Sequence, residues 1–567
     1  MPPRLLLFLV LSAVILVERD VARRLSATFD ELVDLGNGVH AVTHGEVRLG
    51  LEHAPLPKVL AGATVFALGA RERGAAAIQA RIDREAGQRV GAQELYAREL
   101  LLRDNPGFGW RDARPGLDAL VEAGRAPMVV FPLLLLLVAW AWGRELHGER
   151  GGLVALGLAA TWPDLLGHGA LVASDVPLAA TGLLAAYALR CVARRGGWPR
   201  LVGLGAALGL LLASKLTAVF LGAGLLGVAL VLACAPPDPA PLSPAHPFGQ
   251  GTAARRVPAL LLALLAVGLT ALAALAATFL GHDPIAAYRA SLASVYLNAA
   301  PGYLTGFLGD HVAHTWAYYP VALALKAPLP TLALLLLALG VAARAREARV
   351  EWRDELLLHG PALLLLGVTC GFGAQVGTRY LLPVMPFLFV SAGRLGRWAD
   401  SPRRRLLLGL LLGLNLAGSV RDHPFHGSAN SLLAGDPRSF HRLLDDSNQD
   451  WGQGLEALGA WQRRAGVPGQ ELVVVSRDPL FEPAQLEAYG VEGEALPAGP
   501  AALEALFFPR PGRVYAVSTH VVSRGRLQAR ELARAAPPGT RPAELVLGGR
   551  LSPGELVGGG FLIFDLR

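Results

Sequence analysis

The chain of 567 residues is 53% hydrophobic and only 17% charged, with a mean hydropathy of +0.42. Its apolar residues form long runs instead of periodic stripes, which excludes a soluble multidomain protein and predicts a polytopic membrane protein. The net charge of +7 comes from short basic clusters between those runs, which indicates membrane topology and excludes a nucleic-acid-binding protein. The three cysteines form no CxxC pair, which excludes zinc-finger and redox sites.

About eleven apolar runs are predicted to be transmembrane helices, although several are shorter than the ~20 residues that a perpendicular helix needs to cross a bilayer. In chain order they cover residues 5–17, 128–142, 153–171, 176–192, 201–213, 216–234, 257–280, 320–341, 356–372, 380–396 and 406–420. Ser214 and Lys215 split the region 201–234 into two of these runs.

The distribution of arginines predicts the orientation of the chain. Arginines cluster in alternate short loops, at residues 144–150, 190–200, 255–256, 344–353 and 394–405. The other loops, at 162–175, 281–319 and 373–379, carry almost none. Because basic residues stay on the cytoplasmic side, we expect a multi-pass protein of the inner (plasma) membrane whose N-terminus is cytoplasmic and whose C-terminus is extracytoplasmic.

This topology divides the chain into a transmembrane domain, residues 1–420, and an extracytoplasmic tail, residues 421–567. Two large loops of the transmembrane domain, 18–127 and 281–319, also face the outside. In the tail, the segments 471–476, 513–520 and 561–567 are predicted to be strands and 454–464 a helix, which indicates a small α/β domain. The Pro/Gly-rich stretch 235–252 is predicted to be a cytoplasmic linker.

Acidic residues at the outer ends of the apolar runs are the first candidates for chemistry. Asp30 and Glu31 are adjacent carboxylates beside the membrane surface, where one could act as general base for a hydroxyl acceptor and the other could orient it. Helix capping, or ion pairs with nearby arginines, would equally explain them. Asp175 begins the fourth run, where capping alone would account for an acid.

Basic residues at the same side are candidates for binding a lipid-linked phosphate. His53 and Lys58 flank a prolyl turn, where they suit a phosphate or, alternatively, anchor an interfacial helix. Arg379 is a permanently charged fork at an outer helix start and suits phosphate best. The set is completed by Lys215, Lys326 and Tyr380. Lys326 lies about two turns into its run and could instead be buried against an acid.

A divalent metal ion is the one cofactor for which the sequence offers ligands. His40 and His44 are four residues apart and His53 follows, so with a carboxylate they could hold such an ion. A second tight cluster is missing from the sequence, and we therefore expect no metal or other cofactor.

The candidate segments together resemble the bacterial form of the protein O-mannosyltransferase-like GT-C glycosyltransferases, glycosyltransferase family 39. The similar stretches occur in the family's order, at residues 29–31, 52–58, 174–177, 214–215, 326–330, 377–383 and 446–453. The sequence departs from the family at two positions. Ala54 stands at the first position of the usual double proline, and Asp34 replaces a usual histidine.

The resemblance implies a GT-C fold and a polytopic α-helical membrane protein with a small extracytoplasmic α/β domain. It implies transfer, with inversion, of a sugar from a polyprenyl phosphate to a hydroxyl of a protein, lipid or glycan outside the cytoplasm. Asp30 matches the acid regarded as the catalytic base, and Glu31 its acceptor-positioning neighbour. Among the carrier-binding candidates, His53 and Lys58 fall beside the carrier, Asp175 matches an acid lining the cavity, and Arg379 matches a residue of the phosphate pocket. The implied partners are the donor, the acceptor and membrane lipids, with no nucleic acid.

Two other classes of protein fit the same residues. A transporter or flippase of lipid-linked sugars would need acids or broken helices at the middle of the membrane, whereas the charges here lie at the outer ends of the runs. A non-catalytic envelope assembly protein would bind partners through its tail, and its Asp30→Asn variant would be silent. Trp451 could stack on an acceptor sugar, but we favour a helix start packed on the membrane domain.

Overall fold

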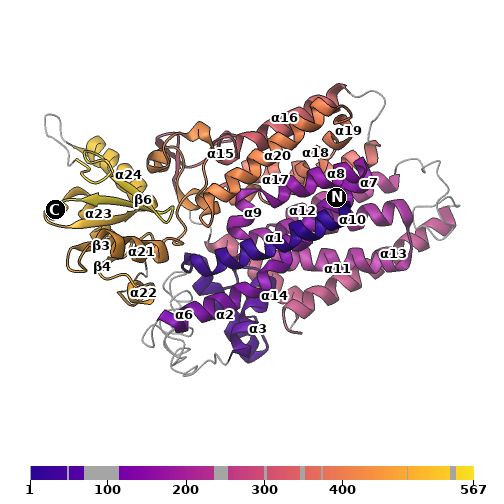
Figure 1. Cartoon of the computed structure of the whole chain (residues 1–567). Coiled ribbons are helices and arrows are strands. Elements are labelled where there is room, and N and C mark those ends of the chain that lie inside the picture. The colour runs from indigo at the N-terminus through magenta and orange to yellow at the C-terminus, as the bar shows by residue number, and fades with distance from the viewer. Residues whose placement is uncertain are drawn as a thin grey trace.

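The computed structural model has a helical body and, near the C-terminus, a small domain built on a β-sheet (Figure 1). It describes residues 2–47, 50–68, 114–234, 253–281, 283–298, 303–344, 351–371, 375–479, 481, 483–536 and 544–567. The predicted linker at 235–252 and a large part of the predicted first loop, residues 69–113, lie outside the described residues.

The N-terminal helices bring the first predicted loop against the helical body. Helix α1 (Pro3–Arg24) is followed by α2 (Phe29–His44), α3 (Pro55–Ala67) and α6 (Arg114–Arg125). A β-carbon added to Gly62 would lie 2.1 Å from the carbonyl carbon of Gly38, so α2 and α3 cross at a contact that only glycine permits.

The apolar helices form the rest of the body. They are α7 (Val130–His147), α8 (Glu149–Ala160), α10 (Asp175–Arg195), α11 (Trp198–Ser214), α12 (Ala218–Cys234), α13 (Ala253–Thr278), α14 (Pro284–Asn298), α15 (Tyr318–Lys326), α16 (Leu329–Arg344), α17 (Trp352–Gly371) and α20 (Pro402–Asp422). Among the described residues, three helical stretches are long and apolar enough to cross a membrane: Ala119–His147, Asp175–Arg195 and Pro258–Thr278. The total of about eleven spans stays a prediction.

Three predicted spans are not continuous helices. The run 320–341 is divided because α15 ends at Lys326, Ala327 is extended and α16 starts at Leu329. The run 153–171 is interrupted because α8 ends at Ala160 and a separate short helix, α9 (Pro163–His168), starts at a proline, which cannot donate the hydrogen bond that continuity requires. The run 380–396 divides into a 3₁₀ turn, η3 (Thr378–Leu381), and two short helices, α18 (Met385–Ala392) and α19 (Leu395–Trp398). The predicted division near Lys215 is confirmed, since α11 ends at Ser214 and Lys215 is extended.

The arginines of two predicted cytoplasmic loops meet at one end of the body. At the C-terminal end of α10, Arg190 and Arg194 pair with Asp354 at 2.8 and 2.7 Å. Arg394 pairs with Glu355, one residue further along the same helix α17, at 3.0 Å. Asp175 is the first residue of α10, so this basic cluster and the acidic candidate lie at opposite ends of one helix.

The C-terminal domain contains a five-stranded sheet with strand order β4-β3-β5-β7-β6. The strands are β3 (Leu472–Val475), β4 (Glu494–Leu496), β5 (Val514–Ser518), β6 (Glu555–Val557) and β7 (Phe561–Asp565), and the helices are α21 (Leu455–Ala465), α22 (Pro483–Ala488), α23 (Pro500–Phe507) and α24 (Thr519–Ala535). Strand β3 is parallel to both β4 and β5, whereas β7 is antiparallel to β5 and β6. This confirms the three predicted strands and the predicted helix; β4 and β6 were not predicted because each has only three residues.

The C-terminal domain is attached to both predicted outer loops. The hairpin of β1 (Thr305–Phe307) and β2 (Asp310–Val312) joins it where the Leu308 N–H donates to the Leu443 carbonyl at 2.7 Å. The chain ahead of α2 joins it where the Phe29 N–H donates to the Trp451 carbonyl at 3.0 Å. The domain therefore lies against the end of the body that carries α2 (Figure 1).

Candidate functional site

The site begins at the N-terminus of α2, where a capping box fixes the backbone. The Thr28 N–H and the Thr28 hydroxyl both donate to Glu31 Oε2, at 2.9 and 3.0 Å, so the Glu31 side chain closes the first turn of the helix. Asp30 lies between them, and its side chain is 22% exposed. The cap therefore buries Glu31 and leaves the side chain of the preceding acid, Asp30, partly accessible.

Asp30 faces a cluster of alternating charges that is assembled from distant parts of the chain. Arg379, on η3, places its Nη1 atom 3.4 Å from Asp30 Oδ2 and 3.9 Å from Asp175 Oδ2. Lys215, at the break between α11 and α12, places Nζ 2.5 Å from Asp175 Oδ1. Asp175 is almost fully buried, so it holds two cations at the end of α10.

Aromatic rings surround the cations. The Lys215 Nζ atom lies 4.4 Å from the centroid of the Tyr380 ring, and the Arg379 guanidinium lies 4.3 Å from that of Trp451. Burial by itself would lower the pKa of Arg379, but Asp175 and Asp30 raise it, so the group stays cationic. Its Nε atom is buried and has no hydrogen-bond partner among the described residues. A donor of this kind suits an anion.

Glu31 contacts a different set of residues from Asp30. Arg125 donates to it through Nε at 2.8 Å and Nη2 at 2.6 Å, and the Val172 N–H donates to Oε1 at 3.0 Å. Burial would raise the pKa of Glu31, but the Arg125 charge lowers it. Glu31 is fully buried and ties α2 to α6 and to the loop before α10. Arg125 was not predicted, because a lone arginine ahead of Ala-Pro gives no distinguishing signal.

His53 and Lys58 are engaged within the turn that precedes and opens α3. The Lys58 Nζ atom donates to the carbonyls of Gly50 at 2.7 Å and His53 at 2.9 Å, and burial lowers the pKa of Lys58 to about 8. His53 Nδ1 lies 2.8 Å from Asp34 Oδ1. Burial would lower the pKa of His53, but the Asp34 carboxylate outweighs it and raises that pKa to about 9. Asp34, the departure from the family pattern, is thus the partner of His53.

Lys326 is buried, as the sequence suggested, but its partners are carbonyls and not an acid. Its Nζ atom donates to the Gly427 carbonyl at 2.6 Å and to the Asn448 carbonyl. The Asn448 side chain in turn accepts from the Thr378 N–H at 3.1 Å, next to Arg379. Lys326 therefore fixes the segment on which η3 rests.

Among the described residues, the histidines proposed as metal ligands form no complete site. The rings of His40 and His44 are adjacent, with centroids 4.5 Å apart. Within the part of the chain that the structure describes, no group of three His, Cys, Asp or Glu side chains is placed to hold a metal ion.

A second arginine reaches the site from the C-terminal domain and was not predicted. Arg477 donates to the Asp450 carbonyl, and its Nη2 atom lies 3.5 Å from Asp446 Oδ1. Tyr303, of the second predicted outer loop, donates to the other carboxylate oxygen of Asp446. Arg477 lies two residues after the end of the buried strand β3, which lies between two parallel neighbours. Charged residues at the carboxyl end of such a strand are candidates for ligand binding, but the parallel neighbours of β3 are known only from the sheet.

A match to one protein family agrees with the family resemblance. Residues 119–236 match the family described as dolichyl-phosphate-mannose-protein mannosyltransferase, which confirms the resemblance over that segment. None of the curated proteins matches the chain.

Solved structures of two proteins resemble the chain over much of its length. ArnT from Cupriavidus metallidurans in the apo state is 12% identical in sequence to this chain. The match covers 98% of this chain and 97% of the ArnT chain, with a TM-score of 0.47. ArnT bound to undecaprenyl phosphate is 11% identical; the match covers 98% of this chain and 97% of the ArnT chain, with a TM-score of 0.46. The archaeal oligosaccharyltransferase AglB from Archaeoglobus fulgidus, in complex with an inhibitory peptide and a dolichol-phosphate, is 12% identical, with coverages of 90% and 69% and a TM-score of 0.40. The roles assigned to residues of this chain rest on its own geometry.

Proposed function

We propose that this chain is a membrane glycosyltransferase that passes a sugar from a polyprenyl phosphate to a hydroxyl acceptor on the extracytoplasmic face. The observation that carries the proposal is the cluster in which an accessible carboxylate, Asp30, faces the cations Arg379 and Lys215. These residues come from different segments, all of which are predicted from the arginine distribution to lie on the outer side. The cluster combines a proton acceptor with an anion-binding group, which is the minimum that this reaction requires.

In the proposed reaction, the acceptor oxygen attacks the anomeric carbon of the donor sugar and the bond from that carbon to the phosphate oxygen breaks. The bonding electrons leave with the phosphate, whose charge Arg379 and Lys215 stabilise. The acceptor proton passes to Asp30, which acts as general base. Attack from the side opposite the leaving phosphate inverts the configuration of the sugar.

The contact between Asp30 and Arg379 fits the state before the donor binds. At 3.4 Å it is long for a charge-assisted hydrogen bond, and the buried Nε atom of Arg379 has no partner among the described residues. A carrier phosphate offers the guanidinium better acceptors than this contact does. Its arrival releases the Asp30 carboxylate to accept the proton of the acceptor hydroxyl.

The other candidates are proposed to act through these residues. Asp175 is paired with both Lys215 and Arg379, so it holds these two proposed phosphate ligands in place. Its own negative charge would repel a phosphate, and Asp175 is therefore a positioning residue. Tyr380 covers the same cations with its ring. Glu31 positions Asp30 by holding the first turn of α2. His53, Lys58 and Lys326 hold the surrounding turns, as their hydrogen bonds indicate.

The test is sugar transfer from radiolabelled polyprenyl-phosphate sugars in membranes that contain the wild type or a variant. The Asp30→Asn variant is expected to lose about 10²–10⁴-fold in rate, the usual contribution of a general base. Asp436→Asn is the matched control, because Asp436 is an exposed acid paired with Arg438 in the tail. If Asp30→Asn turns over at the wild-type rate, Asp30 is not the base; if the wild type consumes no lipid-linked sugar, the protein is not this transferase.

A further inference from the structure

One segment of the chain, residues 446–451, lies between the two halves of the proposed site. It begins in the 3₁₀ turn η7 (Asp446–Asn448) and ends at Trp451. The turn contacts η3, which carries Arg379, and the last residue pairs with the backbone ahead of Asp30 in α2. The segment is therefore a direct protein connection between the proposed phosphate ligand and the proposed base.

The side chain of Asn448 makes the contact with η3. It is fully buried, and its Oδ1 atom accepts the Thr378 N–H at 3.1 Å, one residue before Arg379. Its Nδ2 atom donates to the Tyr318 hydroxyl at 2.9 Å and to the Asp445 carbonyl at 2.7 Å. These three hydrogen bonds fix the orientation of the amide. Asn448 thus holds the backbone from which the Arg379 side chain extends.

Ser447 makes a second contact, with the chain that enters η3. Its hydroxyl donates to the Val376 carbonyl. A β-carbon added to Gly377 would lie 2.5 Å from the Ser447 Oγ atom, and Gly377 has a φ of +132°, a conformation that other residues rarely adopt. Two consecutive residues of the segment therefore hold the start of η3 in one conformation.

The guanidinium of Arg379 depends on this support because its own charge contacts are long. Its Nη1 atom lies 3.4 Å from Asp30 and 3.9 Å from Asp175, and its Nε atom has no hydrogen-bond partner among the described residues. Contacts of this length do not fix a guanidinium as a short charge-assisted pair would. The Trp451 ring, at the far end of the segment, covers the group with its centroid 4.3 Å away. Both the backbone beneath Arg379 and the ring over it are thus held by residues 446–451.

The other end of the segment fixes the start of α2. The Trp451 carbonyl accepts the Phe29 N–H at 3.0 Å, and Phe29 directly precedes Asp30. The pairing continues where the Ser26 hydroxyl donates to the Gly452 carbonyl at 2.9 Å. The segment consequently sets how far the proposed base lies from the proposed phosphate ligand.

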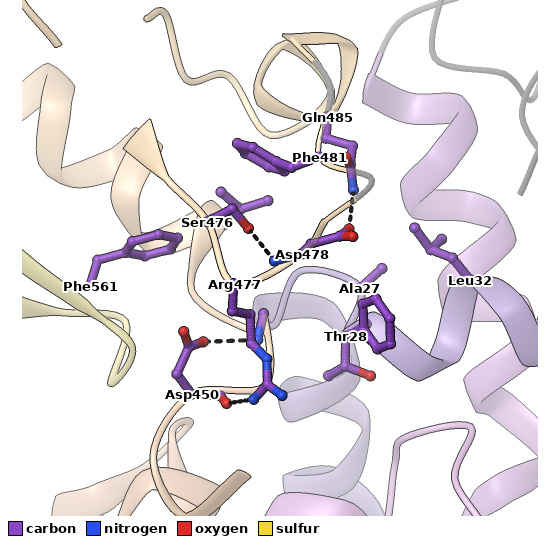
Figure 2. A pocket seen from close by; sticks show the side chains of 13 residues that line it. Ala27, Thr28, Leu32, Asp450, Ser476, Arg477, Asp478, Phe481, Gln485 and Phe561 are labelled. Carbon is purple, nitrogen blue, oxygen red and sulfur yellow. Dashed lines mark hydrogen bonds between the residues drawn. The ribbon is translucent and has the colours of Figure 1, made fainter. Parts of the chain in front are cut away.

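The C-terminal domain holds the segment in place through one arginine. Arg477 lines a small hollow together with Asp450 and Thr28, and it donates to the Asp450 carbonyl (Figure 2). Its Nη2 atom also lies 3.5 Å from Asp446 Oδ1, so one guanidinium contacts two parts of the segment. Asp446 has a φ of +63°, a left-handed conformation that persists in a residue with a side chain where surrounding contacts hold it. Arg477 supplies such a contact.

We propose that Asn448 is a positioning residue of the donor site, and that the segment 446–451 sets the geometry between Arg379 and Asp30. The inference rests on the proposed function. Asn448 acts through Arg379 and not by touching the phosphate, since its own side chain is buried and engaged. The C-terminal domain thereby takes part in donor binding, because Arg477 holds the same segment.

The experiment measures binding of undecaprenyl phosphate to the purified full chain in detergent, together with the melting temperature. The test variant is Asn448→Ala, made both in the wild type and in Arg379→Ala. Asn415→Ala is the matched control, because Asn415 is an equally buried asparagine whose Oδ1 atom accepts the Thr331 hydroxyl at 3.0 Å between α16 and α20. Ser447→Ala takes the place of Asn448→Ala should that variant fail to fold.

Both asparagine variants are expected to lower the melting temperature, but only Asn448→Ala should weaken carrier binding, by about three- to tenfold. Ser447→Ala should weaken it at least about threefold. In the Arg379→Ala background the Asn448 change should have no further effect, because the residue through which it acts is gone. Loss of the Lys326 bond to the Asn448 carbonyl should not have this effect, since the Asn448 side chain and its bond to Thr378 remain.

The proposal is overturned if Asn448→Ala, or Ser447→Ala in its place, binds the carrier as tightly as the wild type. It is also overturned if Asn415→Ala loses as much affinity, or if the effects of Asn448→Ala and Arg379→Ala simply add. A wild type that binds no carrier would overturn the proposed transferase itself. A wild type that binds the carrier, with unchanged binding by Asn448→Ala, would overturn only the positioning role.

Discussion

The Nη1 atom of Arg379 lies 3.4 Å from Oδ2 of Asp30, although 349 positions separate the two residues in the sequence. The pair joins the first predicted outer loop to the turn η3, and it places the proposed base beside the proposed phosphate ligand. Asp175 and Lys215 continue the same chain of opposite charges. An incoming phosphate can join this cluster by exchanging with Asp30, and that exchange is the basis of the proposed activity.

Asp175→Asn should make the protein more dependent on its carrier. Removing this buried carboxylate leaves Lys215 and Arg379 facing each other without their shared anion, which should destabilise the folded state by about 3 kcal/mol. Undecaprenyl phosphate restores an anion at that place, so it should raise the melting temperature of the variant more than that of the wild type. Thermal unfolding with and without carrier measures both effects, and an equal rise in the two proteins would show that Asp175 does not arrange the phosphate ligands.

Glu31→Gln should act on stability before it acts on catalysis. It leaves the Arg125 guanidinium buried without its charge partner, at a cost of about 3–5 kcal/mol in the free energy of unfolding. The control is Glu122→Gln, whose exposed pair with Arg23 is worth about 0–1 kcal/mol. Thermal unfolding in detergent at neutral pH compares the two. Matching effects of the two variants would contradict the anchoring role of Glu31.

His53 should make stability depend on pH at the alkaline side of neutrality. Its pKa is raised from 6.5 to about 9 in the folded protein, so its stabilisation is fully present below pH 6.5 and is lost as the pH rises through 9. The melting temperature of the wild type should therefore fall more steeply over this interval than that of His53→Gln. Parallel curves for the two proteins would show that His53 does not carry a proton in its contact with Asp34.

Lys326→Met should show whether Lys326 stabilises the fold or binds the carrier phosphate. The change leaves the carbonyls of Gly427 and Asn448 without their shared donor, which costs about 1–3 kcal/mol for each buried group. Carrier affinity should change by no more than about twofold. Arg344→Met, at the exposed end of α16, is the control for loss of a positive charge. A tenfold loss of carrier affinity in Lys326→Met alone would place Lys326 among the phosphate ligands.

Local sequence signals predicted the parts of the fold that are set by local chemistry. The buried strands β3, β5 and β7 and the amphipathic helix α21 follow from hydrophobic patterning over a few residues. The break near Lys215 was visible because a polar and a charged residue, Ser214 and Lys215, interrupt an apolar run. The break after Ala160 was missed because hydropathy does not register the effect of Pro163 on helix continuity.

The pairing within the site depends on tertiary contacts that a single sequence does not encode locally. Asp175 begins α10 whereas Lys215 lies in the break between α11 and α12, and Glu31 meets Arg125 across 94 positions of chain. Sequence patterns identified Asp30, Asp175, Lys215 and Arg379 singly, as charges at the ends of apolar runs. The contribution of Arg477 became visible only with the sheet, since the carboxyl end of β3 acquires meaning when its parallel neighbours are known.

Binding of undecaprenyl phosphate by purified wild type, Arg379→Ala and Asp30→Asn tests the division of roles most directly. Arg379→Ala is expected to bind the carrier at least about tenfold more weakly, because it loses a charge-assisted ligand of the phosphate. Asp30→Asn is expected to bind it as tightly as the wild type or more so, because the acid that competes for Arg379 has been neutralised. Unchanged binding by Arg379→Ala, or binding lost equally in both variants, would contradict the proposed site.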